Sequence, residues 1–297
     1  MRNLRLIAVL VVIAALGGCA SCPRSSLAVK AEPGPNPWTS LDVNNDPDRF
    51  QFAIVADRAG GIRPGVFERA VAAVNRLQPE FVMCVGDLIE GNPDTEAGLD
   101  AQYDEFDKIA AGFEMPFFYT AGNHDMGGKS PVAPIKPAKW RERHGRSYYH
   151  FVYRDVLFLV LNSEDPTEGR LSDAQLDYFR GVLAKNRNVR WTLLFLHKPL
   201  WTGEYGPDWA PMQAMLGDRP YTAFAGHTHT YTKYVRDGRS NYVLATTGGS
   251  SKLRGPAEGE FDEVVWITMT DEGPRVANIL LDGLLPDDVR TAAPAKK

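Results

Sequence analysis

Residues 116–125 read PFFYTAGNHD, an apolar run of strand length that ends in an amide, an imidazole and a carboxylate. Residues 221–229 (YTAFAGHTH) have the same form, because two histidines follow the apolar run. Three further apolar runs end beside a residue of metal-ligand type, namely Asp57, Asp87 and His197. Since ligands bind beyond the carboxyl ends of the strands in open α/β sheets, we expect these polar side chains to meet at one rim.

Between the apolar runs lie stretches with apolar residues at helical spacing. Residues 64–77 carry one such pattern and residues 173–183 another, with Ser172 as a helix N-cap. Strands that alternate with helices indicate an α/β protein. Near the end of the chain, residues 232–247 and 263–281 contain Asp-Gly and Glu-Gly turns, which predict two antiparallel hairpins.

The composition of the 297 residues is that of a globular protein, with 44% hydrophobic and 24% charged residues. It excludes a disordered chain, a collagen-like repeat and a polytopic membrane protein. The 33 Lys and Arg residues against 37 Asp and Glu give a net charge of −4, which disfavours a nucleic-acid polymer as partner. Of the three cysteines, Cys84 lies inside an apolar run and is expected to be a buried small hydrophobe.

The N-terminus has the pattern of an export signal. Arg2 and Arg5 precede an apolar run over residues 6–16. That run is too short to span a bilayer, which requires about 20 residues. Residues 16–19 (LGGC) resemble the bacterial lipobox, in which cleavage precedes the cysteine and the cysteine is acylated. We therefore expect acylated Cys19 to anchor the protein to a membrane, with a plain signal peptide as the alternative.

The anchor predicts the domain organisation and the location. Cleavage removes residues 1–18 with two arginines, so 31 basic residues face 37 acidic ones, and a charge of −6 leaves membrane binding to the acyl chains. Residues 19–48 predict a Pro- and Ser-rich tether, residues 49–285 one folded domain and residues 286–297 a flexible tail. We expect a lipid-anchored, periplasm-facing protein of the bacterial cell envelope. Ala20 in place of Asp favours the outer over the inner membrane.

The residue types at the strand ends indicate a metal cofactor. Carboxylate oxygen, amide oxygen and imidazole nitrogen together suit two divalent or trivalent transition-metal ions such as Mn, Fe, Zn or Co. A carboxylate such as Asp87 can bridge two ions, which lie about 3.5–4 Å apart in such sites. The sequence therefore predicts a dinuclear metal centre.

As a set, the motifs resemble those of the calcineurin-like metallophosphoesterases. The matching segments have the family's order and rough spacing over about residues 50–231, and they are Asp57, Gly86–Asp87, Gly122–Asp125, His197 and Gly226–His229. The resemblance implies a four-layer αββα sandwich, in which helices flank two mixed β-sheets and the metals lie at the strand ends. It also implies a hydrolase that attacks a phosphomonoester or phosphodiester with a metal-bridging hydroxide, and hence a small phosphorylated substrate.

The resemblance also implies a role for each motif residue. It makes Asp87 the bridge between the metals, with Asp57 and His229 at the first metal and Asn123, His197 and His227 at the second. His124 is then not a ligand but assists the departure of the leaving oxygen, with Asp125 orienting its imidazole. His144 and His150 lie outside the motifs and are expected to be structural.

One position differs from the family pattern. The first motif is usually Asp-x-His, whereas residues 57–59 read Asp-Arg-Ala, so a ligand of the first metal is missing. Purple acid phosphatases also lack this histidine and supply a tyrosine three residues after the bridging aspartate, where this chain has Glu90. We hypothesise that Glu90 binds the first metal, which favours harder ions such as Mn or Fe over Zn. The alternatives are an exposed loop carboxylate or a partner for Arg58.

Substrate contacts are suggested by three further features. Arg58, just past the first strand, either contacts a phosphoryl oxygen with its planar fork or pairs with Glu90 or a nearby Asp. The loop 126–146 carries six basic residues, which either attract a phosphorylated substrate or form a solvated face. Residues 200–212 contain three aromatic side chains, Trp201, Tyr205 and Trp209, which either stack on a base or sugar or pack beneath the loop.

A second class of function remains open at this point. A catalytically weakened member of the family would bind a phosphorylated envelope ligand without turning it over. Ala59 favours this alternative, whereas the presence of both His124 and Asp125 favours an enzyme.

Overall fold

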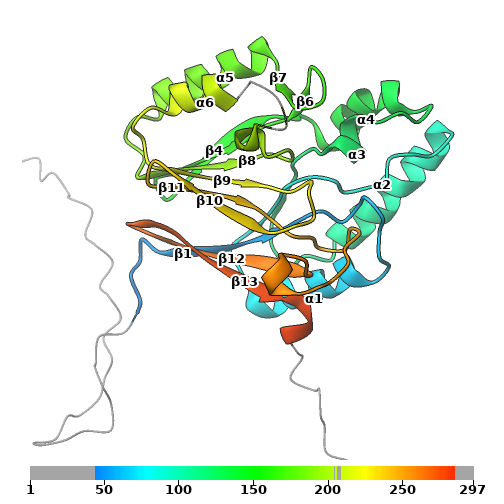
Figure 1. Ribbon diagram of the computed structural model, residues 1–297, viewed down its shortest axis with the longest axis horizontal. Coiled ribbons are helices and arrows are strands. Elements are labelled where there is room, and N and C mark those ends of the chain that lie inside the picture. Colours follow the sequence, from blue (N-terminus) through cyan, green and yellow to red (C-terminus); the bar gives the residue numbers. More distant parts are fainter. Residues whose placement is uncertain (1–43, 204, 206–208, 285–297) are drawn as a thin grey trace, which may run out of the picture. The chain divides into compact units, whose positions relative to one another are not determined.

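The computed structural model describes residues 44–203, 205 and 209–284. Contacts divide the chain after Pro47, and the unit Asp48–Lys297 contains every helix and strand given below (Figure 1). The predicted signal peptide (1–18) and tail (286–297) lie outside the described residues, as does most of the predicted tether (19–48), so these assignments stay predictions.

Two mixed β-sheets form the centre of the unit (Figure 1). The first has the strand order β13 (Gly273–Leu280), β12 (Glu263–Thr270), β1 (Phe50–Val55), β2 (Val82–Cys84) and β3 (Phe117–Phe118). The second has the order β10 (Thr232–Arg236), β11 (Arg239–Val243), β9 (Tyr221–Ala225), β8 (Trp191–Phe195), β5 (Val156–Val160) and β4 (Tyr149–Tyr153). Strands β1, β2 and β3 are parallel to one another, as are β5, β8 and β9. The strands that carry the motif residues therefore end at one edge of each sheet.

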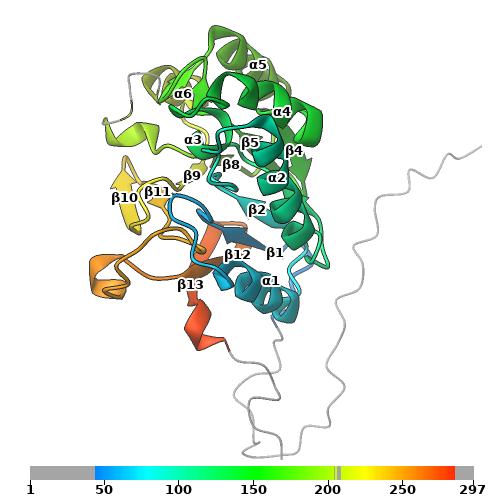
Figure 2. The same cartoon turned by 90° about the vertical axis from the view of Figure 1, so that its right-hand side faces the viewer.

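Helices cover the outer faces of both sheets (Figures 1 and 2). Helices α1 (Val66–Leu77) and α2 (Glu96–Ala110) pack against the first sheet, and α5 (Asp173–Lys185) and α6 (Trp209–Leu216) against the second. The shorter helices α3 (Asn123–Met126) and α4 (Lys136–His144) follow β3, and β6 (Glu164–Asp165) pairs with β7 (Arg170–Leu171). The predicted αββα sandwich with two mixed sheets is confirmed.

Alternation along the strands explains the layers. In β1, Phe52 and Ile54 lie in the core between the two sheets, whereas Ala53 and Val55 pack against the first helical layer. All four side chains are fully buried, which explains why the strand is apolar on both faces. Burying one large apolar side chain contributes roughly 1.5–3 kcal/mol to the stability of the fold. The aromatic core between the sheets therefore stabilises the packing of one sheet against the other.

Most local predictions agree with the structure. Both hairpins form, and the Ser172 hydroxyl caps α5 by accepting a hydrogen bond from the N–H of Gln175 (3.2 Å). Cys84 is fully buried, and burial raises the pKa of its thiol to about 12. The expectation of a loop over residues 126–146 is wrong in part, because residues 136–144 form helix α4.

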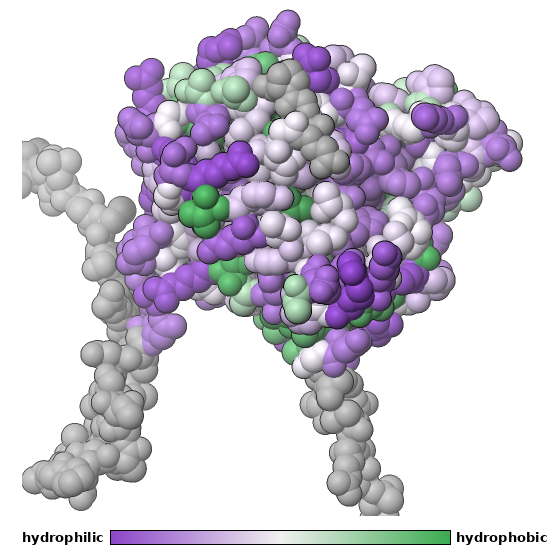
Figure 3. All heavy atoms as spheres, viewed as in Figure 1, coloured by the Kyte–Doolittle hydropathy of each residue, from purple (hydrophilic) through white to green (hydrophobic). Residues whose placement is uncertain are grey.

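No helix within residues 44–203, 205 and 209–284 is long and apolar enough to cross a bilayer. Large apolar side chains that are exposed come from separate elements, namely Val152, Val235, Leu253 and Leu280. The face shown in Figure 3 is accordingly mostly hydrophilic.

Glu263 is a buried carboxyl group that joins the two sheets. It lies on β12 of the first sheet, and its Oε1 accepts a hydrogen bond of 2.8 Å from the N–H of Ala245, just after β11 of the second. Burial raises the pKa of this carboxyl from an ordinary 4.5 to about 8, although the hydrogen bond from Ala245 opposes the shift. Burial therefore favours the uncharged form of Glu263 in the folded protein.

We expect Glu263 to make stability depend on pH. The folded state binds the Glu263 proton more tightly than the unfolded state does. The contribution of Glu263 to the free energy of unfolding is therefore complete below pH 4.5 and is lost as the pH rises to about 8. The loss is at most about 1.4 kcal/mol per pH unit. Glu263→Gln keeps the group uncharged, so its Tm should match that of the unaltered protein near pH 4.5 and exceed it at pH 8. The exposed Glu68→Gln is the control, and equal pH dependence for Glu263→Gln and the unaltered protein contradicts the assignment.

Candidate metal centre

Asp57 lies just beyond β1 and is fully buried. Its Oδ1 accepts a hydrogen bond of 2.9 Å from the N–H of His227, whereas Oδ2 has no hydrogen-bond partner among the described residues. The backbone of Gly226 lies against Oδ2, since a Cβ at that position would be 2.1 Å from it. Glycine therefore lets the segment after β9 approach a buried carboxylate of which one oxygen has no hydrogen-bond partner among the described residues.

Asp87 lies just beyond β2 and is also buried. Its Oδ1 accepts a hydrogen bond of 2.9 Å from the N–H of His124, and its Oδ2 lies 3.2 Å from Nε2 of His197. Burial raises the pKa of Asp87, but the two imidazoles outweigh burial and hold this pKa well below its ordinary range. Asp87 is therefore an anionic carboxylate between two imidazoles.

Backbone carbonyls hold two of the imidazoles in one tautomer. Nδ1 of His197 donates to the carbonyl of Val85 at 2.9 Å, and Nδ1 of His229 donates to the carbonyl of Ser250 at 2.7 Å. Because a carbonyl oxygen only accepts hydrogen bonds, Nδ1 of each imidazole carries a hydrogen, which leaves Nε2 as the nitrogen that would bind a metal once it is deprotonated. Nε2 of His229 lies 3.5 Å from Oδ1 of Asp57.

The ligand-type atoms form two groups that share one residue. The groups are Asp57, Asp87 and His229, and Asp87, His197 and His227, with the atoms of each within 4.8 Å of one another. Asn123 extends the second group, since its Oδ1 lies 2.8 Å from Nε2 of His197, and Nδ1 of His227 lies 3.1 Å from the same nitrogen. The structure thus brings together the residues that the sequence assigns to each metal, apart from Glu90, and Asp87 belongs to both groups.

The donor set fits a pair of cations. Asn123 Oδ1, His197 Nε2 and His227 Nδ1 would face one another as three lone-pair atoms if both imidazoles were neutral, and one oxygen of buried Asp57 lacks a hydrogen-bond partner among the described residues. Such an arrangement is costly without positive charge. Burial lowers the pKa of His197, but Asp87 outweighs burial and raises it to about 10, so the pocket favours positive charge. Mixed oxygen and nitrogen ligands of this kind suit transition-metal ions.

Three of these residues have strained backbones. The dihedral φ is +56° at Asp87, +75° at His227 and +53° at His229, in the left-handed region that residues other than glycine rarely adopt. Such strain persists only where the surrounding structure enforces it, and it is common at functional sites.

His124 lies in α3 beside the second group and is 27% exposed. Its Nδ1 donates a hydrogen bond of 2.8 Å to the carbonyl of Glu90, and its Nε2 lies 4.0 Å from Oδ2 of Asp87. Because Nδ1 already carries a hydrogen for Glu90, any further proton on the imidazole is held at Nε2, the nitrogen on the Asp87 side.

Asp125 does not hydrogen-bond to the imidazole of His124, which the sequence predicts it to orient, but binds backbone N–H groups instead. Its buried carboxylate accepts hydrogen bonds from the backbone N–H groups of Asp87 (2.9 Å) and Gly122 (2.8 Å). Burial and the charge of Asp87 raise the pKa of Asp125, whereas hydrogen bonds from the backbone N–H groups of Gly122 and Leu88 lower it. Asp125 therefore joins the loops after β2 and β3, and the group that orients His124 is the carbonyl of Glu90.

Arg58 is buried and extends toward α2. Its guanidinium donates to the carbonyl of Leu88 (3.0 Å) and pairs with Glu105 at 2.6 Å. Of the two predicted roles, the ion pair is the one that forms, with Glu105 as its partner instead of Glu90.

Glu90 is bound to the glycine-rich loop after β1. Its Oε1 accepts hydrogen bonds from the N–H groups of Gly61 (2.8 Å) and Ile62 (2.6 Å). Neither ligand group includes Glu90, and the side chain of Ala59, which replaces the family histidine, is fully buried. Glu90 as a metal ligand stays a prediction.

Two buried lysines lie beside the site; Lys136 belongs to the basic segment 126–146, whereas Lys198 is not among the predicted residues. Nζ of Lys136 donates to the carbonyls of His124 (2.9 Å) and Gly127 (2.5 Å) and so fixes α3. Nζ of Lys198, the residue after His197, pairs with Glu168 at 2.6 Å. No motif marks either lysine, because their partners are set by the tertiary fold.

The remaining candidates are mostly structural. Trp201 and Trp209 are buried beneath their loop, while the ring of Tyr205 lies 4.9 Å from that of His227. His144 stacks on Tyr119, with ring centroids 4.3 Å apart, which agrees with a structural role.

Comparisons with known proteins agree with this geometry. The calcineurin-like phosphoesterase family matches residues 50–231. The serine/threonine-protein phosphatase CPPED1 of Bos taurus is 28% identical over 183 residues, which cover 58% of this chain and 54% of the relative. The chain thus spans about half the length of the curated relatives it matches.

Two solved structures share the fold at low identity. A purple acid phosphatase from yellow lupin (Lupinus luteus) has a TM-score of 0.61 at 15% identity, covering 80% of this chain and 52% of that chain. A dimetal phosphatase from Danio rerio has a TM-score of 0.54 at 13% identity, covering 78% of this chain and 99% of that chain.

Proposed function

Because the chain belongs to the calcineurin-like phosphoesterase family, we propose that it hydrolyses phosphoric esters at the site between Asp57 and His229. The observation that carries the proposal is the double membership of Asp87, whose carboxylate belongs to both ligand groups. A shared carboxylate is the arrangement that holds two ions close enough to act on one phosphoryl group. The fold alone would not support this function, since one fold hosts many activities.

We assign the first ion to Asp57 and His229, the second to Asn123, His197 and His227, and the bridge to Asp87. When bound, the two ions supply a water of lowered pKa as nucleophile and stabilise charge on the phosphoryl oxygens. The protein orients their ligands through the carbonyls that fix His197 and His229. Mn or Fe suits the first position best if Glu90 also binds there.

His124 acts on the leaving group in this proposal. Nδ1 is held by the carbonyl of Glu90, so Nε2 is the atom that delivers a proton to the departing oxygen. Asp125 supports this step indirectly, because its carboxylate fixes the loops that position Asp87 and α3.

The substrate is proposed to be a phosphorylated molecule, and the relatives' names as protein phosphatases make a phosphoprotein one candidate. The proposal keeps the predicted acylation of Cys19, which would hold the site at the periplasmic face of the envelope. Loss of the protein from the membrane fraction in Cys19→Ser tests that anchor, and an unchanged membrane fraction refutes it.

The direct test of function uses two chromogenic esters. The metal-loaded protein should hydrolyse p-nitrophenyl phosphate or bis-p-nitrophenyl phosphate with Mn²⁺, and a chelator should abolish turnover until Mn²⁺ is restored. The faster ester decides between monoesterase and diesterase. Failure with both esters and every divalent metal would instead favour a module that binds a phosphorylated envelope ligand, the function that Ala59 suggests.

A further inference from the structure

The structure divides the basic segment 126–146 into paired and unpaired cations. Nζ of Lys136 is held by two backbone carbonyls. Lys139 pairs with Glu96 at 2.7 Å, and Arg143 pairs with Asp104 at 2.8 Å. These cations fasten α3 and α2 to α4, so their charges are not free to bind a ligand.

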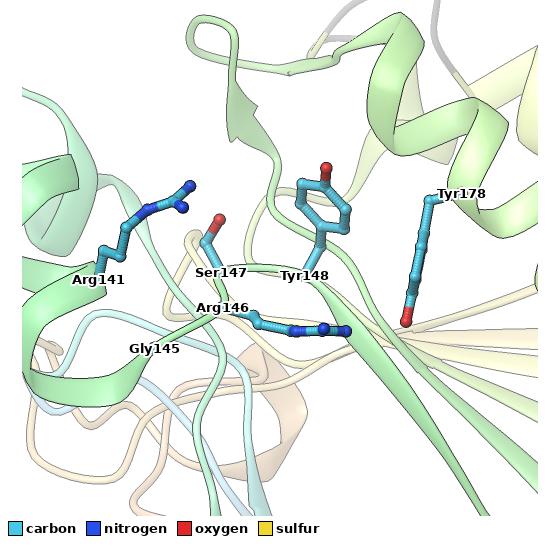
Figure 4. A pocket seen from close by; sticks show the side chains of 6 residues that line it. All are labelled: Arg141, Gly145, Arg146, Ser147, Tyr148 and Tyr178. Atoms are coloured by element: carbon cyan, nitrogen blue, oxygen red, sulfur yellow. The ribbon is translucent and has the colours of Figure 1, made fainter.

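Arg141 and Arg146 are exposed and have no acidic partner among the described residues. Both line a cavity of about 480 Å³, together with Ser147, Tyr148 and Tyr178. Figure 4 shows Arg141 reaching from helix α4 on one side of Ser147, and Arg146 running beneath Tyr148 toward Tyr178. Two planar guanidinium groups beside two aromatic rings therefore face one space between α4 and α5.

A second cavity continues the first toward the metal centre. It measures about 560 Å³, shares Arg141, Ser147 and Tyr148 with the first, and extends to Met126 at the end of α3. The two cavities adjoin one another between α4 and α5, and together they are called the groove; Met126 at its edge is two residues along the chain from His124.

The acidic residues in the second cavity are already partnered. Glu164 lies 3.7 Å from Nζ of Lys198, and Oδ2 of Asp165 accepts a hydrogen bond of 2.6 Å from Ser172. Because Ser172 is neutral, Asp165 keeps its negative charge in the second cavity, whereas the residues that line the first cavity include both arginines and no carboxylate. A guanidinium binds a carboxylate through two parallel hydrogen bonds, which gives geometric specificity as well as charge.

We propose that this groove binds an acidic peptide segment that flanks the phosphorylated residue of a phosphoprotein substrate. The inference rests on the proposed function, and it specifies the substrate class. A groove of two connected cavities with exposed walls suits an extended chain, whose carboxylates pair with Arg141 and Arg146. Tyr148 and Tyr178, both half-buried, form an apolar wall for the stems of its side chains.

The test compares phosphoserine peptides that differ only in two Glu residues, or two Gln residues, at increasing separation from the phosphoserine. For the best separation we expect kcat/KM of the acidic peptide to exceed that of the Gln peptide about 100-fold. Arg141→Gln and Arg146→Gln should each reduce that ratio about tenfold, through KM and not kcat, as expected for loss of one charge-assisted pair at a partly exposed site. Arg141→Lys should give an intermediate ratio, because it keeps the charge but not the planar fork.

The matched control is Arg76→Gln, an exposed cation at the end of α1, which should leave the ratio unchanged. A ratio near one in the unaltered protein, or a high ratio that neither arginine substitution lowers, overturns the proposal. Turnover of p-nitrophenyl phosphate by the same preparation reports the proposed function separately. If that turnover is absent, fluorescence anisotropy of the labelled acidic phosphopeptide measures binding directly. Binding that Arg141→Gln weakens supports the groove. Binding that is absent, or that Arg141→Gln does not change, refutes the groove.

Discussion

Asp87→Asn is expected to abolish phosphoester hydrolysis and to reduce the metal content from two ions per chain to one or none. The replacement is isosteric and keeps an oxygen that can accept the hydrogen bond from His124, so the loop after β2 is expected to keep its fold. What it removes is the negative charge shared by both ligand groups. The fall in kcat/KM should exceed the roughly 10–100-fold that loss of an outer-shell metal partner costs.

The measurement pairs metal analysis by mass spectrometry with kinetics on p-nitrophenyl phosphate. Asp100→Asn provides the matched control, since it removes the same charge from a surface cluster with Lys139 and Arg143. Retention of two ions with near-normal turnover in Asp87→Asn would show that Asp87 is not the bridge.

His124→Ala is expected to lower kcat by about 10²–10⁴-fold while both ions stay bound. The reason is that the imidazole belongs to neither ligand group, while its Nε2 faces the Asp87 side with Nδ1 fixed by Glu90. If His124 delivers the proton, a poor leaving group needs it more, so phenyl phosphate should lose more activity than p-nitrophenyl phosphate.

His150→Ala is the control for removing an imidazole, because His150 lies on β4 and is bound to the hydroxyl of Tyr178. Equal losses for the two esters would place His124 in electrostatic stabilisation and not in proton transfer. Loss of metal from His124→Ala would make it a ligand, contrary to the assignment.

The convergence of the candidate metal-binding residues is largely predictable from the sequence, because these residues follow strand ends. Once β1, β2, β3, β8 and β9 are recognised as parallel strands, their carboxyl ends must converge, and Asp57, Asp87 and His197 converge with them. The glycines of the motifs belong to the same signal, since Gly226 leaves no room for a side chain against Asp57.

The partners of these residues could not be predicted in the same way. Arg58 pairs with Glu105 on α2, a residue remote in the sequence that no local pattern connects to it. Asp125 binds backbone N–H groups of a different loop, although its position directly after His124 suggests contact with the imidazole. Which hydrogen bond forms depends on how the loops approach one another, and that is fixed only by the packed sheets.

Helix α4 shows a similar limit. The loop expectation rests on basic charge alone, whereas the segment KPAKWRERH is rich in strong helix formers with a proline in its first turn, and Trp140 is buried against the first helical layer. Packing of α2 against α4 also decides that, within the described part of the chain, Arg143 is paired and Arg141 is not. Helix α2 supplies Asp100, Asp104 and Asp107 to the face of α4 that carries Arg143.

The central claim is that one carboxylate, that of Asp87, joins two metal ions. Anomalous scattering from crystals grown with Mn²⁺ tests it most directly, and the same map shows whether the carboxylate of Glu90 contacts the first ion. We expect two anomalous peaks about 3.5–4 Å apart on either side of Asp87, one beside Asp57 and His229 and the other beside His197 and His227. A single peak, or a pair of peaks that Asp87 does not connect, would contradict it.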